Sequence, residues 1–241
     1  MRYAIISDVH ANIDALNPVL DAIDAKNIDR TICLGDVVGY NANPNECADA
    51  MRERDIPTIL GNHDAVACGI EEPWGFNPVA LRAALWTREQ LTPENIDWLR
   101  SLPDALNFGA FVGVHGAPKN HNTYLFSWED ILPHLYFLVE QNTNICTIGH
   151  THTPGIFSAD GVYVVDDDSM FSLGDEKSFF INPGSVGQPR DNDPRAAFGI
   201  LDTEADTYEQ VRVEYPVDAA AERVVEAGLP EFLAERLGQG R

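Results

Sequence analysis

The stretch Tyr3-Ala4-Ile5-Ile6-Ser7-Asp8-Val9-His10 places an aspartate and a histidine directly after a short apolar run. An apolar run of this length, bounded by polar residues, predicts a buried strand. Apolar residues then recur at helical spacing, at Leu16, Val19, Leu20 and Ile23. The pattern therefore predicts a strand, a loop and a helix, with Asp8 and His10 at the carboxyl end of the strand.

The same order of elements continues along the chain. Residues 31–34 are predicted as a strand, 44–54 as a helix, and 57–60 as a strand before a turn at Gly61. Strands that alternate with helices imply a βαβ framework and a largely parallel sheet. Two amphipathic stretches, 78–90 and 93–102, follow and are expected to be packing helices.

Beyond these helices the chain changes to short apolar runs divided by Gly, Asp and Pro. Such runs predict a second sheet, antiparallel or mixed, with strands over 108–115, 145–148, 155–165, 178–181, 197–202 and 208–213. A helix over 128–141 would hold Pro133 in its first turn or kink there. The tail over 217–237 has helical periodicity, and we expect it to pack on the domain or to form a dimer contact.

Length and composition set limits on the class of protein. The 241 residues, 44% of them hydrophobic, favour one domain over 1–241 with a helical extension at about 217–241. A net charge of −22 argues against binding along a nucleic-acid backbone, and the acidity fits either a well-solvated surface or a high-salt cytoplasm. The absence of a long apolar run predicts a soluble, cytoplasmic protein without membrane contact. Four scattered cysteines, Cys33, Cys47, Cys68 and Cys146, are expected to be buried hydrophobes.

Metal-ligand residue types gather in short motifs that end predicted strands. After Asp8 and His10 come Gly35-Asp36, Gly61-Asn62-His63-Asp64, His115 and Gly149-His150-Thr151-His152. Each motif alone is weak evidence for metal binding, since an aspartate can lie in an ordinary turn and a histidine can be a buried structural residue. Five of the seven histidines fall in these motifs, whereas His121 and His134 do not and are expected to be polar surface residues. Imidazole nitrogens make up about half of the ligands, which favours Mn, Fe, Zn, Co or Ni over a magnesium-only site.

The order and spacing of these motifs, from Asp8 to His152, resemble the calcineurin-like metallophosphoesterase superfamily, and most closely its small prokaryotic phosphodiesterase group. The resemblance implies an α/β fold, a four-layer αββα sandwich of two mixed sheets flanked by helices. It also implies two divalent transition-metal ions, one held by Asp8, His10 and His152 and the other by Asn62, His115 and His150. Asp36 would bridge the two ions.

The resemblance also implies roles for residues that are not ligands. His63 would assist the leaving group, with Asp64 holding its imidazole in the donor tautomer; alternatively, Asp64 caps the helix that follows. Asn12 would lie beside the substrate, although Ala11 replaces the glycine usual before it. Arg190, in a late loop similar to that of prokaryotic members, would bind the substrate phosphate or pair with surface acids.

The reaction implied is hydrolysis of a small phosphodiester by a metal-bridging hydroxide. The stretch after Asp36 contains no arginine, which relatives that grip a phosphate dianion carry there, and this favours a diester over a monoester. Phosphomonoesterase or Ser/Thr protein phosphatase-like activity is the alternative. A non-catalytic scaffold of the same fold is a more remote one, because His63 and all seven ligands are present.

Overall fold

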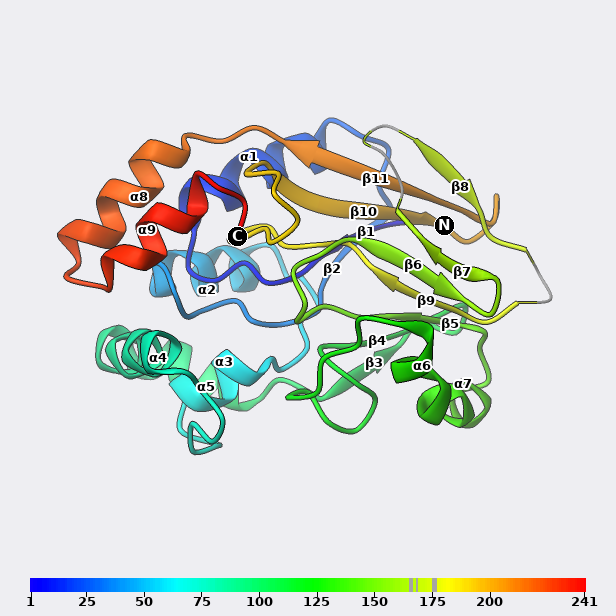
Figure 1. Cartoon of the computed structure of the whole chain (residues 1–241), viewed down its shortest axis with the longest axis horizontal. Helices are drawn as coiled ribbons and strands as arrows, with labels where there is room; N and C mark the ends of the chain where they lie inside the picture. Colours follow the sequence, from blue (N-terminus) through cyan, green and yellow to red (C-terminus); the bar gives the residue numbers. More distant parts are fainter. Residues whose placement is uncertain (165–166, 168, 175–176) are drawn as a thin grey trace.

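The computed structural model describes residues 1–164, 167, 169–174 and 177–241, and its core is a pair of sheets (Figure 1). The first sheet has the order β2-β1-β10-β11-β8, built from Arg30–Cys33, Arg2–Ile6, Ala196–Asp202, Thr207–Val213 and Met170–Ser172. The second has the order β3-β4-β5-β9-β6-β7, built from Ala105–Asn107, Val112–Val114, Ile145–Thr147, Phe179–Asn182, Gly155–Ser158 and Gly161–Tyr163. Both sheets are mixed, as predicted.

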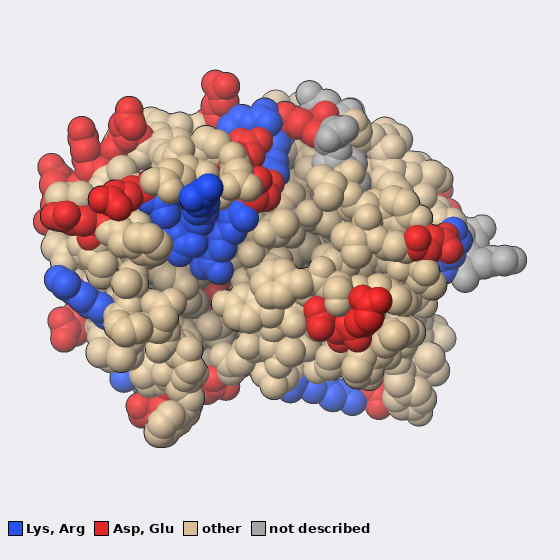
Figure 2. Space-filling model, viewed as in Figure 1, with Lys and Arg blue, Asp and Glu red and all other residues tan. Residues whose placement is uncertain are grey.

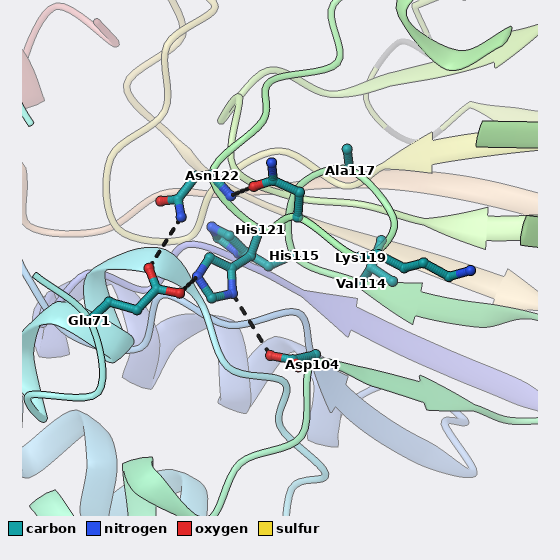
Figure 3. A pocket seen from close by; sticks show the side chains of 9 residues that line it. Glu71, Asp104, Val114, His115, Ala117, Lys119, His121 and Asn122 are labelled. Atoms are coloured by element: carbon teal, nitrogen blue, oxygen red, sulfur yellow. Dashed lines mark hydrogen bonds and ion pairs between the residues drawn. The ribbon is translucent and has the colours of Figure 1, made fainter. Parts of the chain in front are cut away.

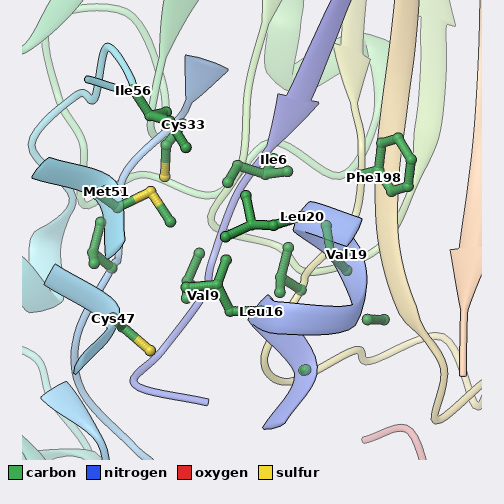
Figure 4. Close-up of a cluster of buried hydrophobic side chains, with 14 of the residues drawn as sticks. Ile6, Val9, Leu16, Val19, Leu20, Cys33, Cys47, Met51, Ile56 and Phe198 are labelled. Carbon is green, nitrogen blue, oxygen red and sulfur yellow. The ribbon is translucent and has the colours of Figure 1, made fainter. Parts of the chain in front are cut away.

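Alternating side chains on the strands fill two different layers. Tyr3 and Ile5 of β1 face the second sheet and share a buried cluster with Ile145 of β5 and Ile181 of β9. The intervening Ala4 and Ile6 face the helices α1 (Ile13–Asp24) and α2 (Pro44–Glu53), as Figure 4 shows for Ile6. Helices α6 (Trp128–Ile131) and α7 (Leu135–Gln141) cover the outer face of the second sheet. The result is the four-layer αββα sandwich.

Strand direction differs from the expectation in the first sheet. Only β1 and β2 are parallel, and β10, β11 and β8 all pair antiparallel. The predicted strand over 57–60 is reduced to one bridge between Cys33 and Thr58, and Leu60 N donates to the carbonyl oxygen of Pro103. This early end brings Gly61 and Asn62, at the start of α3 (Asn62–Ala67), toward the loop after β2.

Other element boundaries differ from the predicted ones for local reasons. Pro133 divides the predicted helix over 128–141 with a 3₁₀ turn over Leu132–His134, since proline cannot donate the next helical hydrogen bond. The run over 155–165 is the hairpin of β6 and β7, and residue 165 lies outside the described residues. Strands β3 and β8 were not predicted, and the strand predicted over 108–115 is reduced to β4, Val112–Val114. Helix α5 is Pro93–Arg100. The four cysteines are free and buried, as expected. None of the described helices is long and apolar enough to cross a membrane.

The C-terminal helices α8 (Val217–Glu226) and α9 (Glu231–Leu237) pack on the body of the protein, as predicted. Val224, Leu229 and Leu233 form a buried cluster with Tyr40 and with Ala80 and Ala83 of α4 (Pro78–Gln90). Helix α8 also contacts α1. The one-domain organisation and the dimer contact remain predictions.

We expect Leu233→Ala to destabilise the protein by ~2–5 kcal/mol, because truncating a fully buried leucine leaves a cavity. Phe232, the preceding residue of α9, is 55% exposed and provides the matched control. Phe232→Ala should change the free energy of unfolding far less. Urea unfolding of both variants measures the difference, and equal small losses would show that α9 is not held by this contact.

Candidate metal centre

The loops that follow β1, β2, β4 and β5, with the first turn of α3, bring the seven predicted ligands together. All seven side chains are buried. Ligand atoms of Asp8, His10 and His152 lie within 4.8 Å of one another, and so do those of Asp36, His115 and His150. The two groups match the division of ligands that the resemblance implies.

Asp36 lies between the two groups. Its Oδ2 is 3.6 Å from His10 Nε2 and 3.3 Å from His115 Nε2. Asn62 Oδ1 completes the second group at 3.1 Å from His115 Nε2. The other Asp36 oxygen, Oδ1, accepts a hydrogen bond from the main-chain nitrogen of His63 at 2.8 Å. One carboxylate oxygen is thus held by the fold, and the other faces ligands of both groups.

Three histidines are fixed in the tautomer that a metal ligand requires. The Nδ1 atoms of His10, His115 and His152 lie 3.1, 2.8 and 2.6 Å from the carbonyl oxygens of Val38, Leu34 and Gln188. A carbonyl oxygen only accepts, so each Nδ1 carries the hydrogen. Each Nε2 is then left with a bare lone pair toward the centre, and main-chain partners of this kind orient metal-binding histidines.

Several buried polar atoms at the centre lack a hydrogen-bond partner or lie against another hydrogen-bond acceptor. His10 Nε2 and His152 Nε2 are 3.0 Å apart with both lone pairs inward. Asp8 Oδ1 and His150 Nε2 have no hydrogen-bond partner in the described chain. Unpaired buried polar atoms are costly, and a cation between these donors removes the cost. The residues present therefore fit two divalent metal ions.

The pKa shifts of the buried histidines agree with a site for two metal ions. Burial lowers the pKa of His150 to about 3 and also lowers the pKa of His10 and His152, so these rings are neutral near pH 7. Burial acts to lower the pKa of His115 as well, but the charge of Asp36 outweighs it and raises that pKa to about 9. A proton on His115 Nε2 thus occupies the position that a metal ion would take beside Asp36.

Backbone strain is concentrated in the ligand residues. Asp8, His10, Asp36, His150 and His152 have positive φ between 47° and 66°. This left-handed conformation costs roughly 1–2 kcal/mol for each residue with a side chain, and such strain gathers at functional sites.

Glycines next to the ligands permit close approach of the loops. A Cβ at Gly61 would lie 2.1 Å from Asp36 Oδ1, and one at Gly149 would lie 2.1 Å from Ser7 Oγ and 2.9 Å from Asp8 Oδ2. Neither position has room for a side chain. The glycines of the two motifs therefore allow the loops to pack closely around the ligands.

His63 lies beside the centre against aromatic rings. Its ring centroid is 4.3 Å from that of Tyr40 and 4.7 Å from that of Phe76. A pocket of about 150 Å³ opens here, lined by His63, His150 and the aromatic residues Tyr40, Trp74, Phe76 and Tyr124. The geometry leaves His63 free to face a group bound in this pocket.

Asp64 does not orient His63, contrary to the first expectation. Its carboxylate accepts hydrogen bonds from the main-chain nitrogens of Val38 at 3.0 Å and Gly61 at 3.1 Å. His63 Nδ1 has no hydrogen-bond partner in the described chain. Burial, with the charge of Asp36, raises the pKa of Asp64 to about 7. Asp64 therefore caps α3 and holds the loop after Asp36, which is the alternative that the sequence left open.

Asn12 also serves the fold in this structure. Its Oδ1 accepts from Ala15 N at the start of α1, and its Nδ2 donates to the carbonyl oxygen of Gly187 at 2.9 Å. With both groups engaged and the residue only 2% exposed, the structure does not support the expected substrate contact. Arg190 differs, since its guanidinium lies 5.6 Å from the Tyr40 ring and its Nε is buried without a partner in the described chain.

Neither of the two remaining histidines belongs to the metal clusters of the described chain, and His121 is less exposed than expected. Its Nε2 lies 3.0 Å from Glu71 Oε1, and Asn122 Nδ2 donates to the other Glu71 oxygen (Figure 3). Asp104 lies on its other side, at 3.9 Å. This network fixes the loop that carries Tyr124, whose ring stacks on His150 at 3.9 Å between centroids.

Comparison with known proteins agrees with the fold. A family model, the calcineurin-like phosphoesterase superfamily domain, matches residues 1–206. An uncharacterized protein of Methanocaldococcus jannaschii is 38% identical over 242 residues, covering 99% of this chain and 98% of that protein. The crystal structure of a metallophosphoesterase from Sphaerobacter thermophilus is 37% identical with a TM-score of 0.87, covering 100% of this chain and 99% of that one. A hypothetical protein from Pyrococcus horikoshii is 20% identical with a TM-score of 0.82, covering 100% and 98% of the two chains, and shares the fold.

Two clusters of Asp and His side chains between two mixed sheets define a metal-dependent hydrolase of the metallophosphoesterase class. The chain belongs to the calcineurin-like phosphoesterase superfamily.

Sequence reasoning missed the aromatic residues around the centre. Tyr40 has φ of 61° and places its ring between His63, His10 and Arg190. Tyr124 comes from a loop far away in the chain. Neither shows a periodicity or a motif that would separate it from an ordinary core aromatic, so only the assembled loops reveal them.

Proposed function

We propose that this protein is a dinuclear metal-dependent phosphodiesterase that hydrolyses small phosphodiesters. The observation that carries the proposal is the pair of buried Asp and His groups with Asp36 between them. In the proposed site, Asp8, His10 and His152 hold one ion, and Asn62, His115 and His150 hold the other. Bound divalent ions would supply Lewis acidity and a hydroxide nucleophile near neutral pH.

The chain's own residues bind and orient the substrate in this proposal. The phosphate would lie over the metal centre, with one ester group in the pocket beside His63 and the aromatic rings. Burial keeps His10, His150 and His152 neutral. A metal ion on His115 would replace the proton that Asp36 favours there, so only Asp8 and Asp36 would offset the charge of two dications. The centre therefore stays positive and attractive to an anionic phosphoester within a strongly acidic protein.

Two observations favour a diester. No arginine follows Asp36 in the loop to Asn41, so that loop offers no cation to a second phosphate charge. The pocket beside His63 is lined by Tyr40, Phe76 and Tyr124, which suit the organic group of an ester. Phosphomonoesterase activity remains the alternative, because Arg190 lies close to the site.

Hydrolysis of bis(p-nitrophenyl) phosphate and p-nitrophenyl phosphate, each with Mn, Ni, Fe, Zn and Mg, tests the proposal. We expect kcat/KM for the diester to exceed that for the monoester by at least about tenfold, which corresponds to ~1.4 kcal/mol in the barrier. Mg should support less activity than the transition metals. His134→Ala, outside the site, is the control variant. Preference for the monoester would favour the alternative, and no activity with any metal would contradict both.

A further inference from the structure

A group of three arginines lies beside the metal centre and comes largely from the C-terminal segment. It consists of Arg190, in the loop after β9, Arg236, in α9, and Arg241. Figure 2 shows a patch of Lys and Arg atoms next to the C-terminus at the end of α9. Arg236 and Arg241 lie beyond residues 1–206, the part of the chain that the superfamily model matches. Both arginines therefore lie outside the matched family domain.

Contacts place Arg236 on the approach to the site. Leu233 and Ala234 of α9 are buried in one cluster with Tyr40, whose ring is 4.6 Å from that of the ligand His10. Arg236 follows Leu233 by three residues, which puts the two on neighbouring faces of the helix. The charge of Arg190 lowers the pKa of Arg236, whereas Tyr40 and Tyr124 raise it. The arginine group thus begins at the Tyr40 ring and extends outward from the centre.

The acidic neighbours of this group are already paired. Asp191 pairs with Arg212, and Asp193 lies 2.7 Å from Arg195. In the described chain, the Arg190 guanidinium donates to Gln188 Oε1 and hydrogen-bonds Tyr40, and Arg236 donates to the main-chain oxygen of Arg241. Neither guanidinium forms an ion pair with an Asp or Glu side chain of the described residues. Two guanidinium groups without an Asp or Glu partner are unusual in a chain with 38 acidic and 16 basic residues.

The electrostatics of the pair point to an anion. Burial lowers the pKa of Arg236 to about 10, and the positive charge of Arg190 adds to the effect. Guanidinium groups carry like charges, so these two repel each other until an anion lies between them. The fork of N–H donors on arginine matches the oxygens of a phosphate, often through two parallel hydrogen bonds.

We propose that Arg236, together with Arg190, binds a second phosphate group of the substrate, outward from the phosphodiester that is cleaved. The substrates would then be phosphodiesters with an additional phosphate on the organic group. Arg236 would determine specificity and have no part in the bond cleavage. This inference rests on the proposed phosphodiesterase function.

Two matched probes test it: thymidine 5′-(p-nitrophenyl phosphate), and the same compound with a 3′-phosphate. Both release p-nitrophenolate from the same diester, so they differ only in the second phosphate. The metal is kept equimolar to the sites, so that free ions do not mask the second phosphate. We expect the wild-type protein to prefer the 3′-phosphorylated probe in kcat/KM by about 10–100-fold, the scale of a hydrogen bond to a charged group.

Arg236→Gln should reduce that preference to near one, chiefly through KM, because the lost contact is made equally in the ground state and the transition state. Arg236→Lys keeps the charge and should retain part of the preference. Arg223→Gln removes the same charge from α8, where Arg223 pairs with Asp14, and should leave both rates unchanged. Melting temperatures verify that each variant is folded.

Two failures can be distinguished. A wild-type protein that hydrolyses both probes at equal kcat/KM, or a preference that persists in Arg236→Gln, would overturn the role of Arg236 and leave the phosphodiesterase function intact. A wild-type protein that hydrolyses neither probe with any metal would overturn the proposed function and this inference with it.

Discussion

Replacing Asp36 by alanine is expected to reduce activity by at least about a thousandfold, more than the loss of any single histidine ligand. Asp36 Oδ2 faces His10 and His115, which belong to different groups, so its removal weakens both proposed metal positions. Metal ions contribute several kcal/mol to such reactions, and each ~1.4 kcal/mol is a factor of ten in rate. The bound metal should fall from about two ions per chain toward zero.

The comparison series is Asp36→Ala, His10→Ala and His150→Ala, each measured by elemental analysis and by diester hydrolysis. Asp97→Ala is the control, because that carboxylate is 80% exposed and distant from the ligands in the chain. Asp36→Asn keeps the shape of the side chain and distinguishes lost charge from lost packing. A variant of Asp36 that still binds two ions and keeps activity would refute its bridging position.

The residues of the two Asp and His groups could be picked out from the sequence because each lies next to the element that positions it. Asp8, Asp36 and His115 follow short apolar runs, and Gly61 and Gly149 mark places where loops approach closely. A side chain directly after a strand can occupy few positions. The residue types at the strand ends, and their order along the chain, therefore predict much of the arrangement of the site. The two groups of ligands then form as the resemblance implies.

Residues whose role depends on distant segments were harder to predict. Asp64 has its partner Val38 26 residues away, and a main-chain nitrogen there competes successfully with the adjacent His63. Asn12 donates a hydrogen bond to Gly187, and α9, which carries Arg236, packs on Tyr40. The prediction of a largely parallel first sheet was wrong for the same reason, since β10, nearly 200 residues further along the chain, pairs antiparallel with β1.

His63 provides the second large expected effect. Burial lowers its pKa to about 4, against the opposing charge of Asp36, so the ring is neutral near pH 7 and donates a hydrogen bond through its N–H. Such a donor stabilises charge on a leaving oxygen only as far as that oxygen needs it. His63→Ala should therefore slow cleavage of an alkoxide leaving group by ~10²–10³ in kcat, the usual scale for one lost hydrogen-bond donor to developing charge. The loss should be small for a nitrophenolate, whose charge is already stable.

A dinucleoside monophosphate and bis(p-nitrophenyl) phosphate, assayed with the same metal-loaded variants, compare the two leaving groups. Both metals should remain in His63→Ala, because its side chain is in neither ligand group. His63→Gln keeps a hydrogen-bond donor near the same place and should recover part of the alkoxide reaction. Equal losses for both leaving groups would point to a structural role against Tyr40 and Phe76, where the ring packs. Loss of metal with the imidazole would instead make His63 a ligand, and either result would remove the leaving-group assignment.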